Sequence, residues 1–201
     1  MARLWASCMG NKKDAIRNEV HNWALELLKK GYKYQAIILL LSTWNFAYFR
    51  YILTSFNLDN FKRELGKLEK TDLKFFDDKK FENVDLNSKE IRNRIENIYR
   101  ILSDSGIAPV GATKVMYLLN PNVFVMWDNG IISHYRTKTK KNRKITGKID
   151  NSPEGYFNFM RLMQKYWKED KFPKSKGKET IPRAIDLYNW NRYRTTKKQK
   201  R

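Results

Sequence analysis

The sequence is poor in cysteine, histidine, glycine and proline. Its one cysteine, Cys8, cannot form a disulfide within the chain, and no paired cysteine and histidine spacing indicates zinc. The longest apolar run, residues 36–41, is far shorter than the roughly 20 residues that span a bilayer. The N-terminal segment also has no apolar stretch of signal-peptide length. These shortages predict a soluble, intracellular protein of the cytoplasm or nucleoid, with no metal, cofactor or membrane partner.

Acidic residues are scarce as well. The chain has 41 Lys and Arg residues against 21 Asp and Glu residues, a formal net charge of +20, and such an imbalance favours polyanionic partners. Residues 136–148 contain seven basic residues and no acidic one. We therefore expect a nucleic-acid partner, although solvated loops and a disordered tail are an alternative explanation of the same charges. The predicted DNA contacts in this run are Arg136, Lys138, Lys140, Lys141, Arg143 and Lys144.

Apolar residues recur at helical spacing through most of the chain. Ile91, Ile95, Ile98 and Leu102 form one such stripe, and the almost wholly apolar residues 34–55 predict one central helix of a bundle. No strand pattern, hairpin turn, internal repeat or glycine-rich phosphate loop is found. The sequence thus predicts an all-α protein. Residues 1–201 would form one compact unit, or two lobes around a central cleft, followed by a basic tail at residues 195–201.

Several residues are predicted to mark the ends of helices. Gly31 is a plausible C-terminal cap, and Asp59, Asn87 and Ser152 are placed to cap helix N-termini. The last helix is expected to run from Thr180 to about residue 193.

The stretch from Gly106 to residue 132, "GIAPVGATKVMYLLNPNVFVMWDNGII", predicts a helix, a hairpin turn and a second helix. The segment "SGIAPVG" supplies turn residues, and "ATKVMYLL" resumes helical spacing until "NPN" ends it. A turn of small residues at the start of a helix exposes backbone N–H groups that can bind a DNA phosphate. The predicted phosphate contacts of this turn are Gly106, Val110, Gly111 and Thr113.

Two charged residues stand in this otherwise apolar stretch. Lys114 is expected in the first turn of its helix, and Asp128 is placed to cap the next helix, "NGIISHY". A chain reversal at "NPN" would bring the two side chains within a few ångströms of each other. A lysine in apolar surroundings is suited to act as a nucleophile, and a nearby carboxylate can stabilise a developing positive charge. The alternative is that Asp128 only caps its helix and pairs with Lys114.

The segments "PVGATKV" and "VMWDNGI" resemble the helix-hairpin-helix DNA glycosylases, particularly the bifunctional glycosylase/lyases of the endonuclease III and 8-oxoguanine glycosylase type. The resemblance covers residues 104–132, the hairpin and catalytic segment. It implies that Lys114 is the nucleophile and that Asp128 is the carboxylate that assists it. It also implies base-excision repair by a monomer on double-stranded DNA, with removal of a damaged, oxidised base through a lysine Schiff base.

A glycosylase must hold its extruded base between flat or apolar side chains. The candidates for this base pocket are Trp44, Phe46 and Trp127, with His134 as a hydrogen-bonding group, although each aromatic residue is also a candidate for core packing. Two other functions remain open. The protein can be a noncatalytic nucleic-acid-binding module in which Lys114 touches a phosphate, or a helical adaptor whose charge serves solubility.

Overall fold

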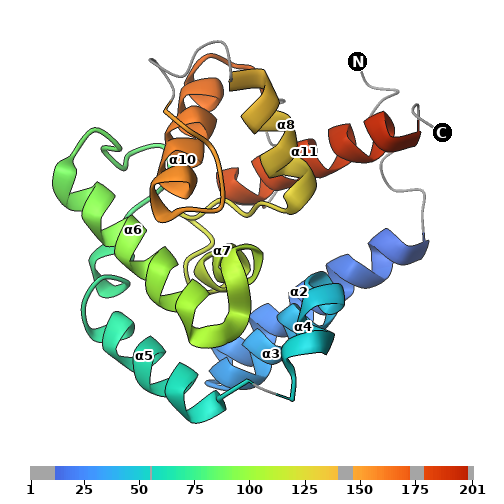
Figure 1. The fold of residues 1–201 in the computed structure, drawn as a ribbon, viewed down its shortest axis with the longest axis vertical. Helices are drawn as coiled ribbons and strands as arrows, with labels where there is room; N and C mark the ends of the chain where they lie inside the picture. Colours follow the sequence, from blue (N-terminus) through green and yellow to red (C-terminus); the bar gives the residue numbers. More distant parts are fainter. Residues whose placement is uncertain (1–11, 55, 140–146, 173–178, 199–201) are drawn as a thin grey trace. The chain divides into compact units, whose positions relative to one another are not determined.

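The computed structural model describes residues 12–54, 56–139, 147–172 and 179–198 of the chain. Every regular element in these ranges is helical, which confirms the predicted all-α class (Figure 1). The chain divides into two compact units, residues 1–56 and residues 57–201. The predicted cleft between two lobes stays a prediction.

The first unit contains three helices among its described residues: α2 (Lys12–Lys29), α3 (Lys33–Trp44) and α4 (Phe46–Ile52). Helix α2 ends at Gly31, whose φ of 84° is left-handed. The backbone N–H groups of Gly31 and Tyr32 donate to the carbonyls of Leu28 and Leu27, so both bonds of a glycine C-cap are present. The predicted cap at Gly31 is confirmed.

The prediction of one central helix over residues 34–55 is wrong. The helix is interrupted at Asn45, which has φ −126° and ψ 25° and separates α3 from α4. Just before the break, the hydroxyls of Ser42 and Thr43 donate to backbone carbonyls of the preceding turn, a bonding pattern that competes with regular helix continuation. Phe49 is buried after the break, but Phe46, Tyr48 and Tyr51 are exposed, and Tyr51 retains 72% of its accessible surface. Segment α4 is therefore apolar in sequence without being central to the core.

The second unit carries the site. Its elements, in chain order, are α5 (Leu58–Lys70), the short 3-10 turn η2 (Lys74–Phe76), α6 (Lys89–Leu102), the π-type turn η3 (Ser103–Ile107), α7 (Ala108–Leu119), α8 (Asn129–Thr139), α10 (Pro153–Lys168) and α11 (Ile181–Lys198). Helix α6 packs against α5, α7 and α10, and α8 packs against α11.

The apolar stripe predicted for α6 is confirmed, because Ile91, Ile95, Ile98 and Leu102 are all buried. Its cap differs from the prediction by one residue: Ser88, and not Asn87, accepts the N–H of Ile91.

Of the caps predicted for α5 and α10, the first is wrong and the second is confirmed. The side chain of Asn57, and not Asp59, accepts the N–H of Asn60 at the start of α5. The predicted cap at Ser152 is confirmed, since its hydroxyl accepts the N–H of Gly155 at 3.0 Å. In both α5 and α6 the observed cap lies within two residues of the predicted one, and both residues are good cap formers.

Helix α7 lies in the middle of the second unit's core. Its residues from Gly111 to Leu118 are all buried, and so is the segment Val123–Trp127 that follows it. The ring of Trp127 packs against those of Tyr99, Tyr156 and Phe159, at centroid distances between 5.2 and 6.1 Å. Polar side chains on α7 are therefore held in a largely apolar environment.

Candidate functional site: a buried charge cluster

The turn between α6 and α7 is tighter than predicted. Gly106 has a φ of 96° and Ala108 a φ of 58°, so the chain reverses at these residues. Helix α7 then begins at Ala108, whereas the sequence predicted that turn residues continue to Gly111. The difference follows from Pro109, which is well suited to the first turn of a helix. Lys114 is consequently in the second turn of α7, and its predicted place in the first turn is corrected.

The four predicted phosphate contacts of this turn divide into two groups. Gly106 is exposed and Val110 is half-buried, so both can meet a ligand at the surface. Gly111 and Thr113 are buried inside the second unit. The hydroxyl of Thr113 donates to the carbonyl of Val110 and accepts the N–H of Trp127 at 3.4 Å. Thr113 thus joins α7 to the segment before α8; it has no exposed surface, and its predicted role as a DNA contact stays a prediction.

Lys114 is buried to an unusual degree for a lysine, with 6% of its surface exposed. It is the charged residue of an otherwise apolar and small-residue stretch of α7, "APVGATKVMYLL". A lysine so removed from water needs compensating charge nearby, because burying an unpaired ammonium is very costly.

Asp128 caps α8, as predicted. Its Oδ1 accepts the backbone N–H of Ile131 at 2.8 Å, and its carbonyl accepts the N–H of Ile132 at 2.9 Å. The side chain is half-buried. The bond occupies Oδ1 and fixes the carboxylate at the N-terminus of α8, where the helix dipole favours negative charge.

A second carboxylate, which the sequence analysis did not identify, comes from α11. Asp186 accepts a hydrogen bond from the guanidinium of Arg183 at 2.7 Å, and the two side chains are only 15% and 9% exposed. Burial is the main cause that raises the pKa of Asp186, and the charge of Asp128 also raises it, while the charges of Arg183 and Lys114 lower it; the resulting pKa is about 6. Charges from α7, α8 and α11 therefore act on one carboxyl group. We call Lys114, Asp128, Arg183 and Asp186 the buried charge cluster.

Two hydrogen bonds hold α11 in place beside this cluster. The hydroxyl of Tyr135 on α8 donates to Oδ1 of Asn189 at 2.7 Å, and both residues are buried. On α7, burial raises the pKa of Tyr117 to about 12, while Arg183 and a hydrogen bond with the side chain of Thr180 lower it. The start and the middle of α11 are thus each linked to a helix that contributes a charge.

The residues proposed for a base pocket are divided between the two units. Trp44 and Phe46 belong to the first unit, where Trp44 stacks on His21 at 5.3 Å and Phe46 is 57% exposed. Trp127 is in the core of the second unit with 1% exposure, so its ring would have to move before it could stack on a base. His134 is half-buried on α8, and burial together with the charges of Lys138 and Arg192 lowers its pKa. The base pocket formed by these four residues stays a prediction.

The basic run begins on α8. Arg136 and Lys138 are exposed there; Arg136 donates to the carbonyl of Ile149, and Lys138 lies over the ring of Tyr166 at 4.9 Å. The other predicted contacts lie outside the described residues: Lys140, Lys141, Arg143 and Lys144.

The predicted tail at residues 195–201 is helical as far as Lys198, where α11 ends, five residues beyond the predicted end of the last helix. Residues 199–201 lie outside the described ranges.

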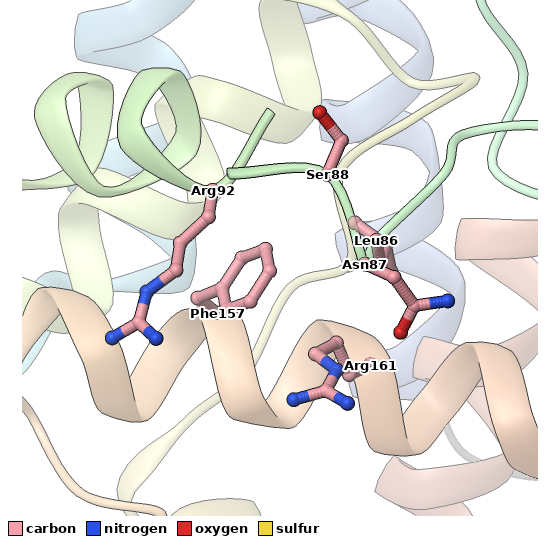
Figure 2. Close-up of a pocket in the computed structure, with 6 residues that line it drawn as sticks. All are labelled: Leu86, Asn87, Ser88, Arg92, Phe157 and Arg161. Carbon is pink, nitrogen blue, oxygen red and sulfur yellow. The ribbon is translucent and has the colours of Figure 1, made fainter. Parts of the chain in front are cut away.

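A separate pocket of about 120 Å³ lies between the start of α6 and the face of α10. It is lined by Leu86, Asn87, Ser88, Arg92, Phe157 and Arg161 (Figure 2). The guanidinium of Arg92 is already bound to Glu96 at 2.7 Å and to Glu154 at 3.0 Å. Because these carboxylates offset its charge and none of the predicted site residues is present, this pocket is not the candidate site.

No family model, curated protein or solved structure matches this chain. Among the described residues, no helix combines the length and the apolar character needed to cross a membrane. Within the same ranges, His, Cys, Asp and Glu side chains form no group of three or more that could hold a metal ion.

The chemistry available to the buried charge cluster is proton exchange and electrostatic stabilisation. The charges of the Lys114 amine and of the Asp128 carboxylate both act on Asp186, and Lys114 is largely removed from water, where charges interact more strongly than at the surface. The sequence contained one indication of Asp186. Asp186 lies on the same side of α11 as the buried residues Pro182, Ile185 and Asn189. An apolar residue is expected on the buried side of a helix, so a carboxylate there is unusual.

Proposed function

We propose that the protein is a DNA glycosylase with abasic-site lyase activity, and that Lys114 is its nucleophile. One observation carries the proposal: Lys114 is a lysine with 6% exposure, and its charge acts on the same carboxyl group, Asp186, as the charge of Asp128 at the cap of α8. The order of α6, a tight turn, α7 with its lysine and a capping aspartate is also the order of the helix-hairpin-helix glycosylases. The resemblance stated for residues 104–132 supports the same assignment.

The proposed reaction starts from a neutral Lys114 amine. Its Nζ lone pair attacks C1′ of the damaged nucleotide, and the base leaves with the electron pair of the glycosidic bond and takes up a proton. Nζ then loses a proton, O4′ departs with the electrons of the C1′–O4′ bond and is protonated, and a C1′=Nζ iminium ion remains. Positive charge develops on the sugar as the base departs, and the carboxylate of Asp128 stabilises it.

The partner in this proposal is double-stranded DNA with a damaged, oxidised base flipped out of the helix. A net charge of +20 favours binding to phosphates, and Arg136 and Lys138 are exposed at the start of the basic run. In the turn, Gly106 and Val110 are the remaining candidates for a phosphate contact by backbone N–H groups. The enzyme is proposed to act as a monomer.

A noncatalytic nucleic-acid-binding module is the second candidate. The observation in its favour is that the buried charge cluster has two positive and two negative members, so it can serve as a structural network with no reaction at all. Asp128 also has a structural task as a cap in either case.

Reductive trapping separates the two candidates. The purified full chain is incubated with borohydride and duplexes that carry 8-oxoguanine, an oxidised pyrimidine, uracil or a plain abasic site. An imine between Lys114 and the sugar would be reduced to a stable covalent complex. The proposal predicts trapping by the wild type and none by Lys114→Ala, with DNA affinity largely retained. Salt-sensitive binding without trapping on any duplex would support the noncatalytic module.

A further inference from the structure

A groove lies between α10 and the loop that leads into α6. It consists of the pocket of about 120 Å³ described above and an adjoining pocket of about 330 Å³, and both are lined by Leu86, Asn87 and Arg161. The larger volume lies within the range of about 300–1,000 Å³ that is typical of ligand sites. The described residues that line the two pockets include none of the buried charge cluster, so we treat them as a separate surface and call them the α10 groove.

A buried glutamine holds the two walls of the α10 groove together. Gln164 of α10, with 7% of its surface exposed, donates through Nε2 to the backbone carbonyls of Phe81 at 2.6 Å and Val84 at 2.8 Å. These bonds tie the loop before α6 to α10. Leu86 from the loop and Leu162 from α10 are both buried where they line the groove. The groove is therefore held in shape by buried contacts of the fold itself.

The rim of the α10 groove is basic. Arg161, Lys165 and Lys168 follow one another at intervals of four and three residues, so they share one face of α10, and all three are exposed. Among the described residues, Arg161 and Lys168 make no ion pair, and Lys165 has only a distant one, with Glu169 at 3.8 Å. Figure 2 shows the guanidinium groups of Arg92 and Arg161 extending over α10. Whereas carboxylates offset the charge of Arg92, most of the charge on α10 is available to an anion.

The spacing of these cations fits a nucleic-acid strand. At a rise of about 1.5 Å per residue, Arg161 and Lys168 are about 10 Å apart along α10, which is the axial length of about three phosphates in one strand of a duplex. Arginine and lysine are both common phosphate ligands. An anionic membrane is a poorer match, because the apolar residues of the groove are buried and cannot enter a lipid surface.

We propose that the α10 groove is a second DNA-binding surface, in which Arg161, Lys165 and Lys168 bind successive phosphates of one strand of a duplex. The inference rests on the DNA partner of the proposed function. It applies to the glycosylase and to the noncatalytic module alike, because it assigns backbone contacts and no reaction. Such contacts position a protein on DNA without reading its sequence. They would add to those proposed for residues 136–148.

A charge variant tests the basic rim. It replaces Arg161, Lys165 and Lys168 by glutamine. Its matched control replaces three exposed lysines of the same unit that do not line the α10 groove. These are Lys70, Lys74 and Lys80. Both variants lose the same net charge, so a difference between them depends on where the charge is removed.

A second variant obstructs the groove and leaves the charge unchanged. Asn87→Trp places a large side chain at an exposed residue that lines both pockets. Its matched control is Asn83→Trp, at an exposed residue of the same loop that lines neither pocket. Urea unfolding verifies that each variant is folded.

The readout is the affinity of the full chain for an undamaged duplex as a function of salt concentration, measured by fluorescence anisotropy. The charge variant should reduce the slope of log affinity against log salt by about two to three units, because each lost phosphate contact removes about 0.9, and its control should reduce the slope by less than about one unit. Asn87→Trp should weaken binding roughly tenfold, and Asn83→Trp should bind as the wild type does.

The failures of the inference and of the proposed function are distinguishable. If the wild type binds DNA and either groove variant behaves as its control does, the inference is overturned and the proposed function stands. A wild type without salt-sensitive affinity for DNA overturns the DNA partner, and the proposed function with it.

Discussion

Oδ1 of Asp128 lies 2.8 Å from the backbone nitrogen of Ile131, so the carboxylate proposed to stabilise the reaction also caps α8. Asparagine is as good an N-cap as aspartate, whereas alanine is not. These two substitutions can therefore separate the charge of Asp128 from its structural role.

The first prediction follows from this double role. Asp128→Asn should keep the free energy of unfolding within about 0.5 kcal/mol of the wild type, whereas Asp128→Ala should lower it by about 1 kcal/mol. Both variants should release base at least tenfold more slowly, because both lose the negative charge. Urea unfolding and single-turnover assays measure the two effects. Normal base release by Asp128→Asn would assign Asp128 to capping alone.

The second prediction concerns the stability of the fold as a function of pH. Asp186 has a pKa of about 6 in the folded protein, compared with an ordinary value of 3.8. Between these values the folded state binds more protons than the unfolded state, so this residue's contribution to stability is complete below about pH 4 and lost as the pH rises through 6. The loss amounts to up to about 3 kcal/mol.

The comparison with Asp186→Asn isolates this effect, since asparagine resembles the protonated carboxyl group at every pH. The free energy of unfolding of the wild type minus that of the variant should fall between pH 4 and 7. A difference that rises over this range would contradict the environment described for Asp186.

The third prediction tests the start of α10. A Cβ at Gly155 would collide with the backbone nitrogen and carbonyl oxygen of Asp150, which cannot move away as a flexible side chain can. Gly155→Ala should lower the free energy of unfolding by about 1–3 kcal/mol. Gly66→Ala in α5 is the control, because a Cβ there meets no atom within 4 Å and should stabilise by up to about 1 kcal/mol. Equal effects of the two changes in urea unfolding would contradict the packing of this turn.

The apolar pattern of the sequence predicted the second unit well because its helices bury one regular face. The stripe of α6 and the cap of α10 at Ser152 depend on spacing and on local bonds, which the sequence displays directly. The break at Asn45 was not predicted because the residues on both sides of it are mostly apolar. It depends on hydrogen bonds from side-chain hydroxyls such as that of Thr43 to the backbone, which the apolar pattern does not show.

The site was only partly predictable for a different reason. Lys114 and Asp128 are the charged residues of one short apolar stretch, so the sequence alone singles out both. Asp186 is 58 positions beyond Asp128, and only the packing of α11 brings its carboxyl group into the same cluster. The burial of Thr113 likewise depends on the position of α7 inside the core.

The fourth prediction concerns the basic run. Replacement of Lys138, Lys140, Lys141, Arg143 and Lys144 by alanine should weaken DNA binding broadly and reduce the slope of log affinity against log salt by up to about one unit per lost phosphate contact. The control removes an equal charge from five exposed lysines elsewhere in the second unit. These are Lys67, Lys70, Lys74, Lys80 and Lys89. Equal loss of slope in both variants would mean that the run contributes only through total charge.

The identity of the lysine that joins the DNA tests the central claim most directly. The complex reduced with borohydride is digested with protease and nuclease, and the modified residue is located by mass spectrometry of the peptides. We predict that the sugar remnant is on Lys114 and that no adduct forms with Lys114→Ala. An adduct on any other lysine, or an adduct that persists in Lys114→Ala, would contradict the assignment of Lys114 as the nucleophile.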